Sequence, residues 1–326
     1  MNYRFLFIGA LGVALAAYLV KFVGFAAVLS AATAVGWRGF MLLILYGMAI
    51  FPLLGTAWFA LLPNAPTRYL RITIYSRMVR DSAAEVLPFS QLGGIALGAR
   101  AATMQGMPTP LAFASVLADI TTELFAQIAY AALGVAILAT WTQRSGGSPS
   151  HTSALVAGLV LAAAAGSAFL FLQLKGRRFT GKIAARLLPS AVTATQTLAG
   201  ALDSVYRSPV RIALSVTVHL IAWIASAFGV WIAFRLIGSH ARWSAVLALE
   251  SLVYAARSVA PFVPNALGVQ EAAYAALAPL FGIGAELGLA ISLIKRARDI
   301  AIGIPVLLVW QAVEGRRALA QRAVDG

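Results

Sequence analysis

The feature that most constrains this chain is the repetition of apolar stretches long enough to cross a lipid bilayer. A spanning helix needs about 20 apolar residues at a rise of about 1.5 Å per residue. The stretches that reach this length are 5–24, 39–62, 109–141, 152–172, 210–237 and 284–312. Because 61% of the residues are hydrophobic and only 11% are charged, polar groups are too few to cover the surface of a soluble protein. The sequence therefore predicts an all-α integral membrane protein with about six full spans.

Two further apolar regions, 67–107 and 244–283, are each interrupted by a run rich in proline and glycine. The interruptions are PFSQLGG at 88–94 and PFVPNALG at 261–268. Proline removes a backbone donor and glycine permits a sharp turn, so each region predicts a helix, a break and a second helix. Each could be a re-entrant hairpin or a pair of full spans, and either alternative leaves the orientation of the later spans unchanged.

Both halves of the chain follow the same order of two spans, a broken hairpin and a further span. We therefore divide the chain into a first membrane half-repeat at 1–144, an outside linker loop at 145–151 and a second half-repeat at 152–326. The order and parity of the spans give the halves opposite orientations, which predicts an inverted repeat. In transporters of this design the substrate site lies near the bilayer midplane, where the broken segments meet.

The basic residues of the loops predict the orientation. Lys and Arg are concentrated in 63–80, in the segment 173–208 and in the C-terminal tail, whereas the opposite loops carry one Arg each. Cytoplasmic loops are enriched in Lys and Arg, so both termini are expected inside, with the first stretch retained as a span. The formal net charge of +14 then faces anionic lipid at the cytoplasmic surface. No basic soluble module is present to bind nucleic acid.

The segment 173–208 mixes basic residues with spaced apolar ones and contains no span. This pattern suits amphipathic helices that lie on the inner leaflet. For the second part of the segment, a plain solvated connector is an equally good interpretation.

Ionisable and amide side chains inside the apolar segments are the candidate functional residues. An ionisable group at the bilayer centre costs at least about 2.5–3.5 kcal/mol, so a function or a partner must account for it. The candidate substrate or gating positions are Arg77, Arg80, Asp81, Glu85, Gln91, Asp119, Glu123, Arg257, Gln270, Glu271, Arg296, Arg298 and Asp299.

Asp119 and Glu123 are the most informative of these candidates. Their i, i+4 spacing places them on one helical face, and no basic residue lies near them in the sequence. Arg296 and Arg298 occupy the corresponding depth in the other half, so we expect the two acids to pair with them across the repeat interface. The alternative is that such pairs only hold helices together.

The residues that usually bind metals or phosphate groups offer little here. The chain has no cysteine, and its histidines at 151, 219 and 240 are far apart in sequence. The run 106–110 is not a phosphate-binding loop. We therefore predict no cofactor, no metal and no ATP hydrolysis by the chain itself. His219, alone in a span, is expected to be packed or hydrogen-bonded rather than to relay protons.

Three runs resemble a known family: SRMVRDSAAEVLPFSQLGG at 76–94, PNALGVQE at 264–271 and SLIKRARD at 292–299. They are similar to the transmembrane region of lysylphosphatidylglycerol synthases, also called flippase-like membrane proteins, and the first run most resembles the hopanoid-biosynthesis-associated branch. The resemblance covers roughly 40–315. It implies a multi-pass protein of the bacterial inner membrane that moves or handles lipids. Because the chain stops at Gly326, we expect the aminoacyl-transferase activity of the synthases to be absent.

Three functions are compatible with these observations. The first is a lipid flippase or lipid-export protein that handles a hopanoid or a phospholipid. The second is a membrane scaffold or accessory subunit for lipid (hopanoid) biosynthesis enzymes. The third is an intramembrane enzyme that uses Asp119 with Glu123, or Asp81 with Glu85, as acid and base. Aspartate-rich metal motifs are absent, which disfavours the third, and we expect no enzymatic activity. The sequence leaves the oligomeric state undecided.

Overall fold

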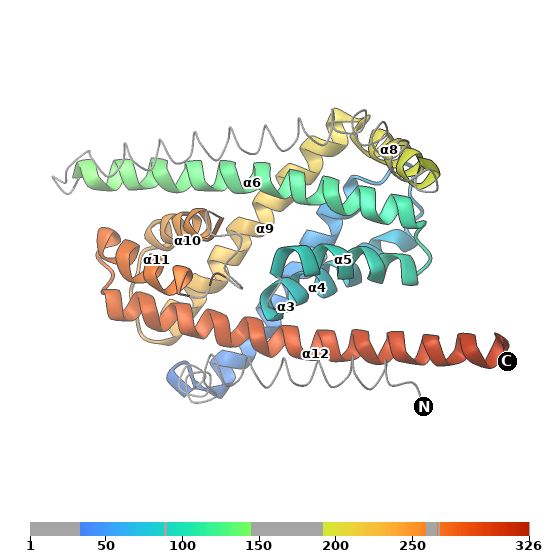
Figure 1. The fold of residues 1–326 in the computed structure, drawn as a ribbon. Coiled ribbons are helices and arrows are strands. Elements are labelled where there is room, and N and C mark those ends of the chain that lie inside the picture. The colour runs from blue at the N-terminus through green and yellow to red at the C-terminus, as the bar shows by residue number, and fades with distance from the viewer. Residues whose placement is uncertain (1–32, 88–89, 145–191, 259–265, 267, 326) are drawn as a thin grey trace.

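The computed structural model describes residues 33–87, 90–144, 192–258, 266 and 268–325 (Figure 1). Regular secondary structure in these residues is helical, which confirms the all-α class. The elements in chain order are α3 (Gly36–Ala60), α4 (Arg68–Val86), α5 (Ser90–Met104), α6 (Thr109–Arg144), α8 (Val192–Tyr206), α9 (Pro209–Leu236), α10 (Trp243–Ser258), α11 (Val269–Leu277), the 3-10 helix η3 (Ala278–Phe281) and α12 (Ala285–Asp325). The predicted spans 5–24 and 152–172 and the linker 145–151 lie outside the described residues.

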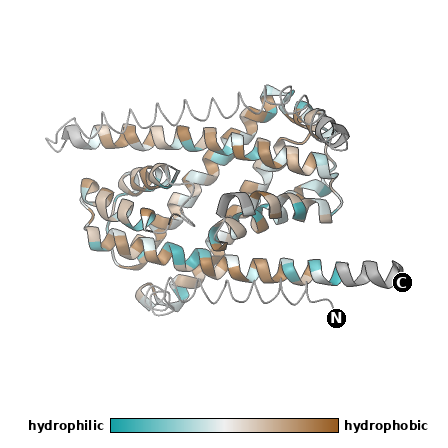
Figure 2. Cartoon of the chain, in the orientation of Figure 1, coloured by the Kyte–Doolittle hydropathy of each residue, from teal (hydrophilic) through white to brown (hydrophobic). Residues whose placement is uncertain are grey.

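Three of the described helices are long and apolar enough to cross a membrane. They are Gly36–Ala60, Thr109–Trp141 and Pro209–Leu236, and they coincide with the predicted spans 39–62, 109–141 and 210–237. The predicted span 284–312 lies within α12, a helix of 41 residues. Figure 2 shows that hydrophilic residues interrupt the apolar surface of α12, and the sequence places four charged residues at 295–299. These charges make α12 too polar to count as an apolar span.

The first broken region forms a hairpin of α4 and α5, as predicted, although its glycines have a different role from the one expected. α4 ends at Val86 and α5 begins at Ser90, so Gly94 lies inside α5 and not in the break. A Cβ added at Gly94 would come within 2.7 Å of the Arg80 carbonyl oxygen. Small residues let membrane helices approach closely, so this glycine joins the two arms of the hairpin.

The second broken region also forms two helices, α10 and α11, on either side of the predicted interruption. Gly268 precedes α11 with φ of 78°, a backbone conformation that favours glycine. α11 has nine residues, which gives a length of about 14 Å, against a hydrocarbon thickness of about 30 Å. α11 is therefore too short to be a full span by itself, which favours the re-entrant alternative for this region.

The two hairpins lie at opposite ends of the molecule, between α6 on one side and α12 on the other (Figure 1). α3 and α9 pack against each other and cross the middle. The larger apolar core joins α10, α11 and the first part of α12 to α6, α9 and the start of α3. A second core joins α4 and α5 to the other parts of α3 and α6. Each hairpin thus has its own apolar support.

The second part of the predicted segment 173–208 is the helix α8, so the helical interpretation is correct for 192–206 and the connector interpretation is wrong there. Val205 is buried in a small cluster with Leu61 and Ala118. The Tyr206 hydroxyl donates to Thr121 Oγ1 over 3.1 Å. α8 is thereby fixed to α6 by its last turn.

Candidate functional site

Four buried charged side chains of α4 and α6 pair with one another in a group that we call the buried ion lattice: Arg77, Arg80, Asp119 and Glu123. Arg77 places Nη1 2.6 Å from Asp119 Oδ2 and Nη2 2.5 Å from Glu123 Oε1. Arg80 places Nη1 2.6 Å from Asp119 Oδ2, and its Nη2 donates to Glu123 Oε2. Each carboxylate therefore accepts from both guanidinium groups, and all four residues are buried. Asp81 on α4 adds a third carboxylate at the edge of the lattice, where its Oδ2 accepts from Arg77 Nε at 2.7 Å.

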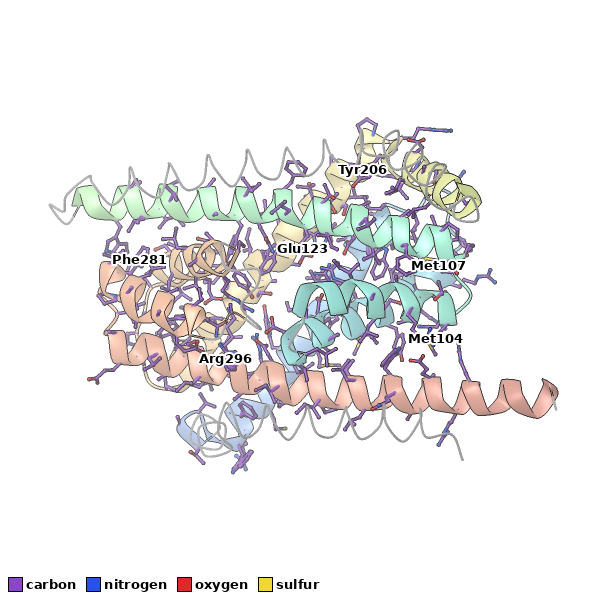
Figure 3. The ribbon with its side chains drawn as sticks, viewed as in Figure 1. Met104, Met107, Glu123, Tyr206, Phe281 and Arg296 are labelled. Carbon is purple, nitrogen blue, oxygen red and sulfur yellow. The ribbon has the colours of Figure 1, made fainter. Side chains whose placement is uncertain are left out.

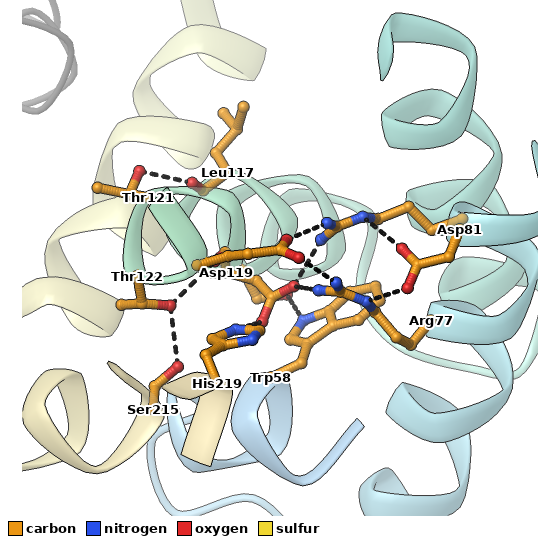
Figure 4. A network of polar contacts seen from close by, with 12 residues as sticks. Trp58, Arg77, Asp81, Leu117, Asp119, Thr121, Thr122, Ser215 and His219 are labelled. Carbon is orange, nitrogen blue, oxygen red and sulfur yellow. Dashed lines mark hydrogen bonds and ion pairs between the residues drawn. The ribbon is translucent and has the colours of Figure 1, made fainter. Parts of the chain in front are cut away.

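Neighbouring helices hold the lattice through uncharged hydrogen bonds (Figure 4). His219 on α9 lies with Nε2 3.0 Å from Asp119 Oδ1. Thr122 and Ser215 link α6 to α9 through their hydroxyls at 2.9 Å. Trp58 on α3 donates from Nε1 to Ser115 Oγ at 2.9 Å. These contacts fix α6 between α3 and α9, and they agree with the expectation that His219 is a hydrogen-bonded residue.

The predicted pairing of Asp119 and Glu123 with Arg296 and Arg298 is wrong. Glu123 on α6 and Arg296 on α12 lie apart in Figure 3, and both arginine partners of the acids come from α4. Arg296 donates instead to Glu271 at 2.8 Å, and Arg298 donates to Asp299 at 2.7 Å. The hairpin packs on α6 through α5 and brings the arginine side chains of α4 within reach, so arginines some 40 residues away in sequence pair with these acids.

A second buried ion pair supports the other hairpin. Lys295 Nζ on α12 lies 2.6 Å from Glu250 Oε2 on α10, and Tyr274 on α11 donates its hydroxyl to Glu250 Oε1. Lys295 also lies 4.3 Å from the ring centre of Tyr254, a favourable cation–π geometry. Glu250 and Lys295 were outside the candidate set. Their signal in the sequence was a charge within an otherwise apolar segment, the same signal that identified Asp119.

The tips of the two hairpins meet through Arg257. Arg257 Nη2 donates to Glu85 on α4 at 3.0 Å, and Nη1 donates to Gln270 Oε1 on α11 at 2.9 Å. Gln270 in turn donates from Nε2 to Ser292 Oγ on α12 at 3.0 Å. The structure therefore joins three of the predicted residues, from both halves of the chain, in a single network.

Glu271 and Gln91 complete the candidate set. Glu271 accepts from the Gly268 backbone N–H at 2.9 Å and caps the start of α11, while its other oxygen accepts from Arg296. A cap of this kind stabilises the first turn of a helix. The backbone of Gln91 belongs to α5, but its side chain lies outside the described residues.

A cleft of about 130 Å³, which we call the central cleft, opens between the hairpins, with room for several water molecules. Its charged lining consists of Asp81, Glu85, Arg298 and Asp299. The side chains of Asp81 and Glu85 are 23% and 29% exposed, whereas that of Asp119 is completely buried. Apolar residues of α3 and α12 face these charges: Ile50, Phe51, Leu54 and Ile302. The cleft therefore presents both polar and apolar walls.

The family of the chain is shown by its sequence. A family model of the lysylphosphatidylglycerol synthase transmembrane region matches residues 7–306. The chain belongs to this family. The matched range contains both hairpins, the buried ion lattice and the central cleft, and it confirms the resemblance of the three sequence runs. No curated protein and no solved structure matches the chain.

Membership of the lysylphosphatidylglycerol synthase transmembrane-region family makes this a membrane protein of a lipid-related family. In this member, the acids of the lattice are each held by two arginines and have no access to the cleft. The acids of the cleft are each held by nearby arginines and are partly exposed. Among the described residues, no group of three or more His, Asp or Glu side chains is placed to hold a metal ion. The chemistry that this arrangement supports is reversible binding of a polar group.

Proposed function

We propose that this protein moves a lipid across the membrane by holding its polar headgroup in the central cleft while the hydrocarbon tail stays in the bilayer. The observation that carries this proposal is the lining of the cleft. Charged side chains of α4 and α12 face an apolar wall of α3 within a helical membrane protein. A lipid has the same two kinds of surface, so the cleft can replace part of the hydration of a headgroup without exposing the tail to water.

The placement of the hairpins supports a transport mechanism. The tips of both hairpins meet through Arg257 and Glu85 beside the cleft, and the hairpins lie at opposite ends of the molecule (Figure 1). Transporters built from inverted repeats place their binding sites at such a junction of broken helices. We propose that the half-repeats 1–144 and 152–326 form such a pair and that the cleft opens alternately to the two leaflets.

The cargo we propose is a hopanoid or a phospholipid, and the site of action is the bacterial inner membrane with both termini inside. The chain carries no phosphate-binding loop, so transport proceeds without ATP hydrolysis of its own. Anionic lipid at the cytoplasmic face is a further expected partner, because the basic loops lie there in this orientation. A scaffold for lipid-biosynthesis enzymes is the competing proposal.

An enzymatic role is disfavoured by the geometry of the acids. General acid–base catalysis needs a carboxyl group that can exchange its proton with a substrate. Asp119 and Glu123 are buried, and each accepts hydrogen bonds from both arginines of the lattice. Asp81 and Glu85 line the cleft, so for this second pair our proposal that the protein is not an enzyme depends on finding no covalently changed lipid in the liposomes described below.

The test is reconstitution of the purified protein in liposomes that contain a lipid with a fluorescent headgroup. A membrane-impermeant quencher reports how much lipid has changed leaflet. Ser226→Leu places a larger side chain in the cleft from α9, and Thr217→Leu makes the matched change at an exposed position of the same helix. We expect native and Thr217→Leu protein to move lipid, and Ser226→Leu to be at least tenfold slower.

Other results would favour other functions. A covalently changed lipid would indicate an enzyme, and neither movement nor a changed lipid would favour the scaffold. Equal rates for Ser226→Leu and native protein would show that the lipid takes a path outside the central cleft.

A further inference from the structure

Three carboxylates share the two guanidinium groups of the lattice, and Asp81 receives the weakest contacts of the three. Arg77 donates from Nε to Asp81 Oδ2 at 2.7 Å, but Arg80 Nε lies 3.4 Å from Oδ1. Asp119 and Glu123 each accept from both arginines. A distance of 3.4 Å is long for a strong charge-assisted hydrogen bond. Asp81 Oδ1 is therefore the oxygen of this group that can accept a proton.

The charges packed around the lattice and the cleft do not balance among the described residues. They come from α4, α6, α10, α11 and α12, and they are Arg77, Arg80, Asp81, Glu85, Asp119, Glu123, Glu250, Arg257, Glu271, Lys295, Arg296, Arg298 and Asp299. Seven acids face six arginine and lysine side chains, together with the ring of His219 on α9 and the hydroxyls of Tyr46 on α3 and Tyr254 on α10. An excess negative charge in a membrane interior is unfavourable, so one further positive charge or proton is expected there.

The position of Asp81 makes it the place for that proton. Asp81 lines the cleft beside Glu85 and Asp299, and like charges favour protonation of one member of such a group. Its neighbour Ser82 also lines the cleft and is 3% exposed, and its Oγ has no hydrogen-bond partner. A buried hydroxyl without a partner is unusual, so this wall of the cleft retains an unsatisfied polar group beside Asp81. His219 does not line the cleft, and its Nδ1 is buried without a hydrogen-bond partner, so this ring has no contact with the cleft water.

We propose that Asp81 is an exchangeable proton site in the central cleft and that lipid movement is coupled to its protonation. In the empty cleft, the O–H bond at Oδ1 removes the excess negative charge. When a headgroup that carries a positively charged group enters, that charge replaces the proton, the O–H bond breaks, and the proton leaves to the water of the cleft while the electron pair stays on Oδ1. This coupling rests on the proposed function, whereas the proton site itself does not.

The proton site is tested by infrared difference spectroscopy of the protein in lipid, titrated with acid and base. We expect native protein to show a stretching band of a protonated carboxyl group, which Asp81→Asn abolishes and Asp81→Glu shifts in frequency. His219→Gln should retain the band, whereas Glu85→Gln and Asp299→Asn each remove the excess negative charge and should weaken it. A native protein without such a band, or a band that persists in Asp81→Asn, would overturn the proposal.

The coupling is tested in liposomes with an imposed pH gradient and the labelled lipid described above. We expect the native rate to change several-fold when the gradient is reversed, and the rate of Asp81→Asn to be indifferent to it. A native rate that is indifferent to the gradient would refute coupling and leave the transport function intact. Absence of any lipid movement would refute the transport function and the coupling with it, while the infrared band would still decide the proton site.

Discussion

The buried ion lattice and the central cleft are built from the same residue types, and both use side chains of α4. They differ in how many arginines hold each carboxylate and in how exposed its side chain is. In the lattice, each carboxylate accepts from two arginines, and Asp119 is completely buried. In the cleft, Glu85 accepts from Arg257, Asp299 accepts from Arg298, and Glu85 keeps 29% of its side chain exposed. The number of cationic partners of a carboxylate and its access to water therefore distinguish a structural ion pair from one that can exchange its partner.

The energetic consequence is a difference in rigidity. Removing one partner from a buried ion pair leaves a charge without compensation, which is strongly unfavourable. A partly exposed ion pair contributes little, because water can solvate either partner when the pair opens. The lattice therefore fixes the α4–α5 hairpin to α6, and the cleft beside it can change its contacts at a small cost. This difference in rigidity is compatible with the headgroup site that we propose in the cleft.

The largest effect on stability is expected from removing a charge from the buried ion lattice. Asp119→Asn removes the completely buried carboxylate that pairs with both Arg77 and Arg80, and leaves them with Glu123 and the partly exposed Asp81. We expect a loss of about 3–5 kcal/mol in the free energy of unfolding. Equilibrium unfolding in detergent measures it. Asp299→Asn is the matched control in the cleft and should cost about 1 kcal/mol or less. Equal losses would show that the two regions do not differ.

A double-mutant cycle identifies which arginine pairs with Asp119. Arg80→Gln together with Asp119→Asn should show a coupling energy of about 0.5–3 kcal/mol, because the two side chains are in direct contact at 2.6 Å. Arg296→Gln together with Asp119→Asn should be additive to within about 0.3–0.5 kcal/mol. Unfolding of the single and double variants under the same conditions gives both values. Coupling of Asp119 to Arg296 but not to Arg80 would contradict the lattice.

A smaller effect is expected from the uncharged support of the lattice. Ser215→Ala removes the buried hydroxyl that contacts Thr122 Oγ1 at 2.9 Å, and we expect a loss of about 1 kcal/mol. Thr122 still donates to the Asp119 carbonyl oxygen, so its own hydroxyl is not left unpaired. Thr217→Ala, at an exposed position of α9, should change stability by less than about 0.5 kcal/mol. A loss for Ser215→Ala as large as that for Asp119→Asn would mean that the charges are not what stabilises the lattice.

A change of one cleft acid should have a small effect on stability and a large one on transport. Glu85→Gln weakens the contact between the hairpin tips but keeps the shape of the side chain, so the free energy of unfolding should fall by less than about 1 kcal/mol. Lipid movement in liposomes should be at least tenfold slower, because Glu85 lines the cleft. Normal transport with reduced stability would reverse the roles assigned to the two regions.

Much of the candidate site could be predicted from the sequence, because a charged residue in an apolar segment can be recognised without knowing what it contacts. Asp81, Glu85 and Arg257 were identified in this way, and the structure brings them to the cleft and the hairpin junction. The same signal was present in Glu250 and Lys295, which form a buried pair. The role of Gly94 could not be predicted, because a glycine in a break and a glycine at a helix–helix contact look alike until the neighbouring helix is placed.

The sequence by itself determined the properties that a bilayer imposes on each segment separately: the all-α class, the positions of spans 39–62, 109–141 and 210–237, and the places where helices break. Length, apolarity and proline act locally, so they can be recognised without knowing what packs against the segment. Only the tertiary structure decided that Asp119 and Glu123 pair with Arg77 and Arg80 and not with Arg296 and Arg298. Several pairings would have neutralised the same charges, and the choice depends on which faces of distant helices meet when the α4–α5 hairpin packs against α6.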